Sequence, residues 1–231
     1  MKSAVLLSVA LLAVVGTEAF AQTESDFAIY TDKRGYLTIT GYTGNAVNVV
    51  IPQTIGGAPV DKIGRGVFAG KTAIRSIAAP NTVRDIGEGA FQGCTALTSV
   101  TLPEGLTDID DRAFAGCTSL ASIVIPNTVR EIDDDAFRGC ASLAEITLPQ
   151  GLEKIGDRAF ADCTALKRIA LPPGVREVEN SAFYGCTALT TVTLPTGLRK
   201  VARGAFMGCV SLDAATRDDI LRRFGSRAIF G

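Results

Sequence analysis

The sequence predicts a repeat solenoid, a fold in which short similar segments stack along one axis. Two observations predict it: the phrase AFQGCTAL at residues 90–97 returns five more times in closely related form, and each copy begins 23 residues after the one before. A third observation is chemical, because the chain of 231 residues has six cysteines but neither histidine nor tryptophan. A reactive site needs one nucleophile, whereas a repeat needs the same core residue in every turn.

The first 21 residues predict a secretory signal peptide that is cut away from the fold. Lys2 gives a positive start, a 14-residue apolar run follows at positions 3–16, and Ala19 and Ala21 form a small-x-small cleavage site. The run is shorter than the ~20 residues of a transmembrane helix, and no later stretch predicts a membrane span. We therefore expect an exported protein that is periplasmic, surface-associated or secreted.

Residues 22–45 predict a β cap for the first turn of the solenoid. Within them, FAIYTDKRGYLTITGY at 27–42 alternates apolar and polar side chains on both sides of DKRG, in which Asp32 and Gly35 favour a turn. The segment is therefore expected to form a β-hairpin. Such a cap hides the core that would otherwise be open at the end of a stack.

Residues 46–211 predict the solenoid itself, in seven units. Phenylalanine, cysteine and proline each recur in it with a step of 23 residues. A longer first unit at 46–73 carries a five-residue insertion within QTIGGAPVDKI. Six regular units follow without interruption: 74–96, 97–119, 120–142, 143–165, 166–188 and 189–211.

The unit LTSVTLPEGLTDIDDRAFAGCTS at 97–119 shows how one turn is built. Val100 and Leu102 alternate with polar residues, as in a half-buried strand, and Pro103 ends the strand because it lacks a backbone N–H. Phe114 and Cys117 then form a short apolar patch, with a glycine between them as the turn position. One unit cannot bury its apolar face alone, so the units are expected to stack into one continuous core.

The phrase L-x-x-I/V-x-L-P … I-x-x-x-A-F-x-G-C resembles the BspA-like leucine-rich repeats of bacterial surface proteins, and its constant 23-residue length resembles the treponemal branch of that family. The resemblance covers nearly all of the chain after residue 21. It implies an α/β-type leucine-rich repeat, a curved right-handed solenoid with short parallel strands on its concave face. Members of the family are exported, and several are adhesins for host matrix proteins, plasma proteins or other cells.

Residues 212–231 break the repeat and predict a helical cap. The segment TRDDILRRFG favours a short helix with Thr216 as N-cap, Asp218 and Asp219 in its first turn and Gly225 as the stop. Three apolar side chains are spaced to cover the last turn of the core: Ile220, Leu221 and Phe224.

The six cysteines are expected to be buried free thiols. A ladder with a 23-residue step spaces them about 5 Å apart in a row, and a row cannot surround a zinc ion with tetrahedral geometry. Parallel side chains in a ladder also point the same way, which disfavours disulfides although the spacing would allow them. Free cysteine packs as a small apolar residue. Disulfides remain the alternative, because export favours oxidation.

The composition also excludes several functions. Without histidine, a Ser-His-Asp or Cys-His catalytic arrangement cannot form, and the usual imidazole metal ligand is missing. A formal net charge of -1 gives no electrostatic footprint for nucleic acid. We therefore expect no enzyme, no cofactor and no metal site, and a protein as the partner.

The outward positions of the strands are the candidate partner-binding face, with a merely solvated sheet face as the alternative. This set is small, flat and mostly uncharged, and it comprises Ser99, Thr101, Ser122, Val124, Glu145, Thr147, Arg168, Thr191 and Thr193. Side chains typical of binding hot spots occur together in one stretch of the sequence: Lys167, Arg168, Arg176 and Tyr184.

Acidic residues gather at one turn of neighbouring units. They are Asp108, Asp110, Asp111, Glu131, Asp133, Asp134, Asp135 and Asp157. Carboxylates in this density could hold calcium, but no D-x-D-x-D-G loop is present, and Arg112, Arg130 and Arg158 are close enough to neutralise them. The favoured interpretation is a solvated acidic face.

Together these features predict an exported binding module, adhesin-like, that holds a protein partner through its repeat surface. The alternative is a structural or scaffold protein of the periplasm that associates with itself through an uncovered sheet edge, since edge strands invite pairing.

Overall fold

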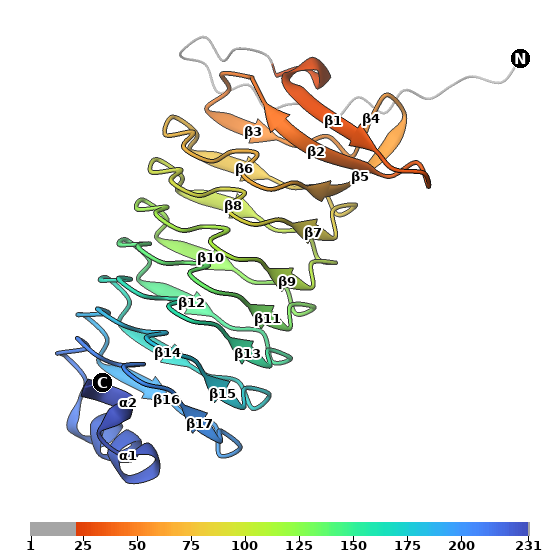
Figure 1. Ribbon diagram of the computed structural model, residues 1–231. Helices are drawn as coiled ribbons and strands as arrows, with labels where there is room; N and C mark the ends of the chain where they lie inside the picture. The colour runs from red at the N-terminus through yellow and green to blue at the C-terminus, as the bar shows by residue number, and fades with distance from the viewer. Residues whose placement is uncertain (1–21, 231) are drawn as a thin grey trace, which may run out of the picture.

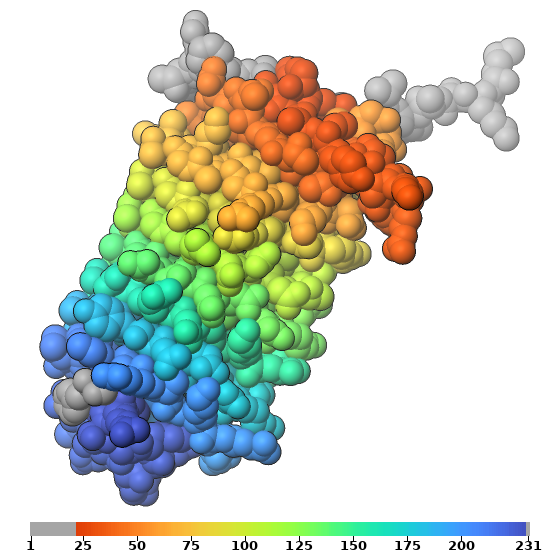
Figure 2. All heavy atoms as spheres, in the orientation of Figure 1, coloured from red at the N-terminus to blue at the C-terminus, as the bar shows by residue number. Residues whose placement is uncertain are grey.

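The computed structural model describes residues 22–230 and shows a β-solenoid with parallel strands, as expected (Figure 1). A strand-rich N-terminal end is followed by the stacked units and by two helices at the C-terminal end. In the space-filling view, successive parts of the chain form successive bands across the molecule (Figure 2). No helix among residues 22–230 is long and apolar enough to cross a membrane. The expected signal peptide, residues 1–21, lies outside the described part.

The N-terminal hairpin joins β1 (Phe27–Thr31) to β2 (Leu37–Tyr42) in antiparallel pairing, after a short 3-10 helix (Glu24–Asp26). Asp32 shapes the turn, because its Oδ1 accepts the backbone N–H groups of Arg34 and Tyr36 at 2.8 and 3.0 Å. Gly35 follows with a φ of 86°, which a residue with a side chain rarely adopts. The predicted hairpin and its turn residues are therefore confirmed.

The insertion of the first unit forms a second small hairpin. It joins β4 (Thr54–Ile55) to β5 (Ala58–Ile63) through Gly56 and Gly57, both at positive φ. β5 also runs parallel to β2 on one side and to β7 (Asp85–Ile86) on the other. The N-terminal hairpin is thus continuous with the sheet of the solenoid.

Each of the six regular units supplies one three-residue strand and, further along, one two-residue strand; the first unit supplies β3 to the first row. The first row consists of β3 (Asn48–Val50), β6 (Ser76–Ala78), β8 (Ser99–Thr101), β10 (Ser122–Val124), β12 (Glu145–Thr147), β14 (Arg168–Ala170) and β16 (Thr191–Thr193). After β7, the second row continues with β9 (Asp108–Ile109), β11 (Glu131–Ile132), β13 (Lys154–Ile155), β15 (Glu177–Val178) and β17 (Lys200–Val201). From β6 onward, residues 23 apart face each other where neighbours pair, as Ser122 and Glu145 do, whereas the insertion in the first unit makes the step from β3 to β6 28 residues, as from Asn48 to Ser76.

A ladder of seven phenylalanines fills the core from Phe68 to Phe206, and all seven are fully buried. Neighbouring ring centroids lie 5.0 to 5.6 Å apart. From Phe114 onward the ring planes are within 4° of parallel. Tyr42 and Phe27 extend the ladder into the N-terminal hairpin with centroid separations of 5.2 Å. The core is therefore continuous across the units.

The six cysteines form a second buried ladder of free thiols, as expected. Each Sγ–H donates to the backbone carbonyl of the phenylalanine one unit earlier, for example from Cys140 to Phe114 at 3.2 Å. The same bond is made at 3.1 or 3.2 Å by the others: Cys94, Cys117, Cys163, Cys186 and Cys209. A thiol at this position is small and apolar and also supplies a weak donor. Burial raises the pKa of Cys94 to about 11 and that of Cys140 to about 12.

The helical cap consists of α1 (Ala214–Phe224) and α2 (Arg227–Phe230). Ile220 is fully buried and Leu221 and Phe224 pack against the core, as expected, and Gly225 ends α1 with a φ of 75°. The predicted N-cap, Thr216, was wrong: the cap lies three residues earlier, at Asp213, whose side chain accepts the Thr216 N–H at 2.7 Å. This bond lowers the pKa of Asp213.

Candidate protein-binding face

The outward side of the first strand row, β3 to β16, forms a surface that we call the strand face. The nine predicted partner-binding residues all lie on it, in β8, β10, β12, β14 and β16. Eight are exposed, and Val124 is the most open large apolar side chain, with 80% of its surface accessible. Thr191 is half-buried because its hydroxyl donates to Asp213 at 3.2 Å, so it holds the C-terminal cap.

A hollow of about 560 Å³ opens on the strand face over β12, β14 and β16. Its lining consists of Ala144, Glu145, Ile146, Thr147, Lys167, Arg168, Ile169, Ala170, Thr191 and Thr193. Five of the nine predicted residues are among them, while the four on β8 and β10 lie outside the hollow. The sequence predicted the strands on a concave face but not a hollow at this end of it.

The hydrogen-bonding pattern of the first row places this hollow beside a break. The row is bonded as three separate sheets, β3-β6-β8, β10-β12 and β14-β16. β12 and β14 are therefore neighbours without a regular ladder between them, and the hollow spans both. A strand ladder normally pairs each backbone group with its neighbour; the same interruption occurs between β8 and β10, so the strand face has two such breaks, and the hollow lies over one of them.

The charged side chains of the hollow come from neighbouring strand positions. Glu145 and Arg168 occupy the same position in adjacent units, and Lys167 precedes Arg168. In the described part of the chain, none of the three takes part in an ion pair within 4 Å. Both signs of charge are thus exposed to a partner within one concave surface.

The predicted hot-spot stretch is divided between two places. Lys167 and Arg168 line the hollow, but Arg176 and Tyr184 do not. Arg176 donates from its guanidinium to the backbone carbonyl of Pro173 at 3.0 Å. Tyr184 lies in the turn between Phe183 and Gly185 and is 41% exposed. Only the first two residues can therefore contribute to the hollow.

The acidic turn has a structural role in the stack. The Asp134 N–H donates to Asp111 at 3.0 Å, the Asp157 N–H donates to Asp134 at 2.8 Å, and the Asn180 N–H donates to Asp157 at 3.0 Å. The side chains of Asp111, Asp134 and Asp157 therefore each form a hydrogen bond between one unit and the next. These bonds give three of the acidic side chains a structural role.

The remaining acidic side chains are partly neutralised. Arg158 makes two bonds of 3.0 Å to Asp135, and Lys154 pairs with Asp133 at 3.1 Å. Carboxylate oxygens of Asp110, Asp111 and Asp133 come within 4.8 Å of one another. Arginine and lysine side chains thus neutralise part of the acidic turn, while these three carboxylates remain close together.

Comparison with known proteins shows where this architecture recurs. The family model of the BspA type leucine rich repeat region matches six copies over residues 61–175 and 107–231. A crystal structure of a leucine-rich repeat protein from T. pallidum is 34% identical, with a TM-score of 0.84, over 87% of this chain and 94% of that one. A Bacteroides ovatus leucine-rich repeat protein is 28% identical, with a TM-score of 0.58, over 75% of this chain and 53% of that one.

Among curated proteins, none is similar enough to count as a match. Solenoids of the matched type are generally non-enzymatic scaffolds that bind protein partners. The repeat phrase, the stacked parallel strands and the family match over most of the chain agree with one another. The chain therefore belongs to the BspA-type leucine-rich repeat family.

Proposed function

We propose that this chain is an exported, adhesin-like binding module that holds a protein partner, of the host matrix or plasma class, on its strand face. The observation that carries the proposal is the hollow over β12, β14 and β16, which coincides with five of the predicted residues. Solenoid surfaces bind partners through such extended curved faces. The signal-like segment at residues 1–21 supports export.

The chemistry of the face supports binding by area more than by a few anchors. Its side chains are mainly small and hydroxylated, and the hollow holds only Lys167, Arg168 and Glu145 as charged groups. Buried area converts poorly to affinity when hot spots are absent. We expect a dissociation constant in the micromolar range, on the order of -8 kcal/mol, strengthened when many copies are displayed together.

The test is a binding assay of the purified protein against a panel of matrix and plasma proteins, followed by substitution on the strand face. Thr147, Ala170 and Thr193 occupy one position in adjacent strands and are all exposed. Replacing the three together by Glu should abolish binding while the protein stays folded, because none of their side chains is in the core and the like charges on paired strands should cost only about 1 kcal/mol. Single replacement of Ser99, Thr101, Ser122 or Thr147 by Ala should change binding little.

A matched control uses the turn side of the same three units. Thr164, Thr187 and Val210 are also exposed and also share one repeat position, but they lie after the cysteines and not in strands. Their replacement by Glu adds the same charge without touching the strand face. Normal binding by the Thr147, Ala170 and Thr193 variant, or equal loss in both variants, would contradict the assignment of the face.

A further inference from the structure

The solenoid closes most of its exposed ends with its own residues. At the C-terminal end, α2 covers the last turn, where the Phe206 N–H donates to the Ala228 carbonyl at 2.9 Å. At the N-terminal end, the amide of Gln22 pairs with both backbone groups of Val50 on the edge strand β3, accepting its N–H at 2.9 Å. The first contact covers the last turn of the core, and the second occupies part of a free strand edge, which would otherwise invite pairing.

β1 stands at the end of its sheet and pairs only with β2, and with five residues it is the longest described strand that has a single partner. The Asp32 N–H donates to the Tyr36 carbonyl, so Asp32 and Tyr36 form a hydrogen-bonded pair next to the strands of the hairpin. Since antiparallel pairs alternate along the ladder, Ile29 and Thr31 direct their N–H and C=O groups away from β2. No described strand lies on that side, and Figure 1 shows β1 at the outer end of the stack.

The side chains of this edge are more apolar than those of a protected edge. Ile29 is 43% exposed and Tyr30 is 61% exposed, although Ile29 stands opposite the fully buried Ile39. Natural edge strands usually carry charged residues or proline to prevent association. β1 carries neither between Phe27 and Thr31, and its register shift between Ala28 and Ile29 lies at the start of the outward-facing stretch.

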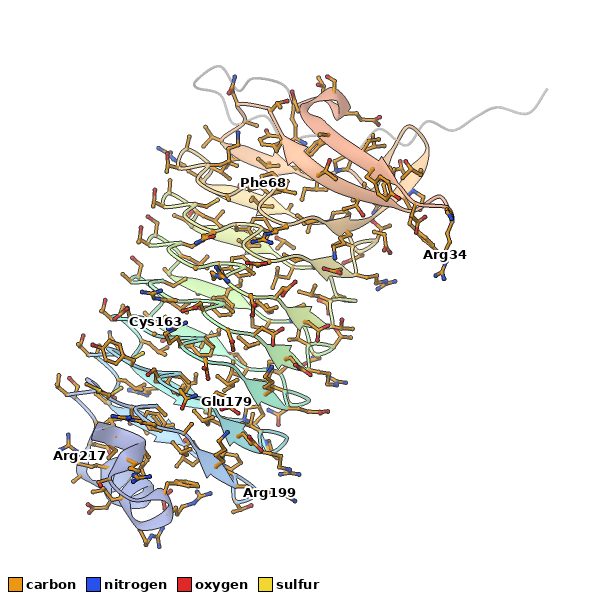
Figure 3. All side chains as sticks on the ribbon, in the orientation of Figure 1. Arg34, Phe68, Cys163, Glu179, Arg199 and Arg217 are labelled. Atoms are coloured by element: carbon orange, nitrogen blue, oxygen red, sulfur yellow. The ribbon has the colours of Figure 1, made fainter. Side chains whose placement is uncertain are left out.

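The charges at the two ends of β1 indicate which strand could pair with it. Glu24 and Asp26 lie before the strand, and Lys33 and Arg34 lie after it in the hairpin turn. In the described part of the chain, Lys33 and Arg34 have no ion-pair partner, and Arg34 projects from the hairpin tip (Figure 3). Antiparallel pairing of two identical copies brings the acidic end of each to the basic end of the other.

We infer that the protein forms a head-to-head dimer in which β1 pairs antiparallel with β1 of a second copy. The outward groups set the register: Ile29 exchanges backbone hydrogen bonds with Thr31 of the second copy, and Tyr30 lies opposite Tyr30 across the twofold axis. This register brings the acidic segment before β1 of each copy toward the basic hairpin turn of the other. The contact involves one short strand per copy, so the dimer dissociates on dilution.

The first test is sedimentation of the purified protein over a concentration series, with a Thr31→Pro variant. The Thr31 N–H faces away from β2, so proline removes a hydrogen bond of the dimer and none of the hairpin. We expect a reversible monomer–dimer equilibrium and at least a tenfold weaker dimer in Thr31→Pro, with the same melting curve. Arg34→Glu should also weaken the dimer and reduce its sensitivity to salt.

The second test uses crosslinking, since the six native cysteines are buried. Tyr30→Cys should form a disulfide between copies under mild oxidation, whereas the exposed Val124→Cys on the strand face should not. The inference is overturned by a monomer at every concentration, by a dimer that Thr31→Pro does not weaken, or by equal crosslinking at both positions. Binding of an extended peptide of another protein to β1, without dimer formation, would also overturn it. Binding of a partner to the strand face should be unaffected by Thr31→Pro, so the two proposals fail separately.

Discussion

At the scale of single residues, the repeated phrase is explained by two side chains. Phenylalanine fills the centre of each turn, and cysteine fills the smaller space beside it while donating to a phenylalanine carbonyl of the preceding unit. The first unit has Lys71 at the cysteine position, next to the hairpin cap, where its ammonium lies 6.0 Å from the centroid of the Tyr42 ring. The departure occurs where the position is no longer enclosed on both sides.

The phenylalanine ladder is tested by Phe137→Ala. The ring is fully buried and stacks on Phe114 and Phe160 at 5.2 and 5.4 Å. Its removal should lower the free energy of unfolding by about 3–5 kcal/mol through cavity formation. Chemical denaturation measures this change, and Val124→Ala, an exposed position in the same unit, serves as the control with an expected change near zero. Equal stability of the two variants would refute the ladder assignment.

The buried thiols predict a dependence of stability on pH. The pKa of Cys140 is about 12 in the folded protein, above its ordinary value of 9.0, because burial disfavours the thiolate. Below the ordinary value the thiol is protonated in both states, and its contribution to stability is fully present. As the pH rises above that value, the unfolded chain ionises first, so the contribution is lost progressively up to the folded pKa.

The measurement compares denaturation of the natural protein and Cys140→Ala at several pH values above 9.0. Each buried thiol contributes a slope of at most about 1.4 kcal/mol per pH unit in this window. The natural protein should therefore lose stability more steeply with pH than the variant does. Parallel pH profiles would show that Cys140 ionises equally easily in both states.

At the scale of elements, one turn position with positive φ is occupied by glycine in some units and by a residue with a side chain in others. The residue two positions before each phenylalanine has positive φ, and Gly204 fills this place in the last unit while Ser181 fills it in the unit before, with a φ of 55°. A Cβ added to Gly204 would meet only ordinary contacts, with Ser181 Oγ at 3.4 Å. The difference between these two positions is therefore a matter of backbone strain.

Exchange of these two residues gives opposite expected results. Ser181→Gly relieves the left-handed strain and should raise stability by about 0.5–1 kcal/mol, while Gly204→Ser should lower it by a similar amount. Thermal unfolding of both variants provides the measurement. A change of the same sign in both would mean that side-chain contacts, and not φ, decide at this position.

Some elements could be predicted from the sequence and others could not. The three-residue strands follow from the apolar alternation before each proline, as in Val100 and Leu102. The two-residue strands of the second row carry one buried residue each, such as Ile109, which is too short for a recognisable period. The start of α1 was misplaced because Asp213 and Thr216 are both good caps three residues apart, and only the backbone geometry decides between them.

At the scale of the whole molecule, the constant 23-residue step is what made the fold predictable. It fixes the register between units, so one unit defines all the others. The hollow over β12, β14 and β16 could not be predicted in this way, because nothing in the sequence of these strands, including Ile146 and Ile169, distinguishes them from the rest of the row. The residues of the candidate face and its concave side could thus be predicted, but the position of the hollow could not.

The central claim is that the repeated cysteine phrase builds a core and carries no chemistry. The most direct measurement is a count of thiols that react with an aromatic disulfide reagent, in the native protein and after denaturation without reductant. All six Sγ atoms belong to buried residues, so the native protein should react slowly, and the denatured protein should show close to six reactive groups. Rapid reaction of one thiol in the native protein, or few thiols after denaturation, would contradict the claim.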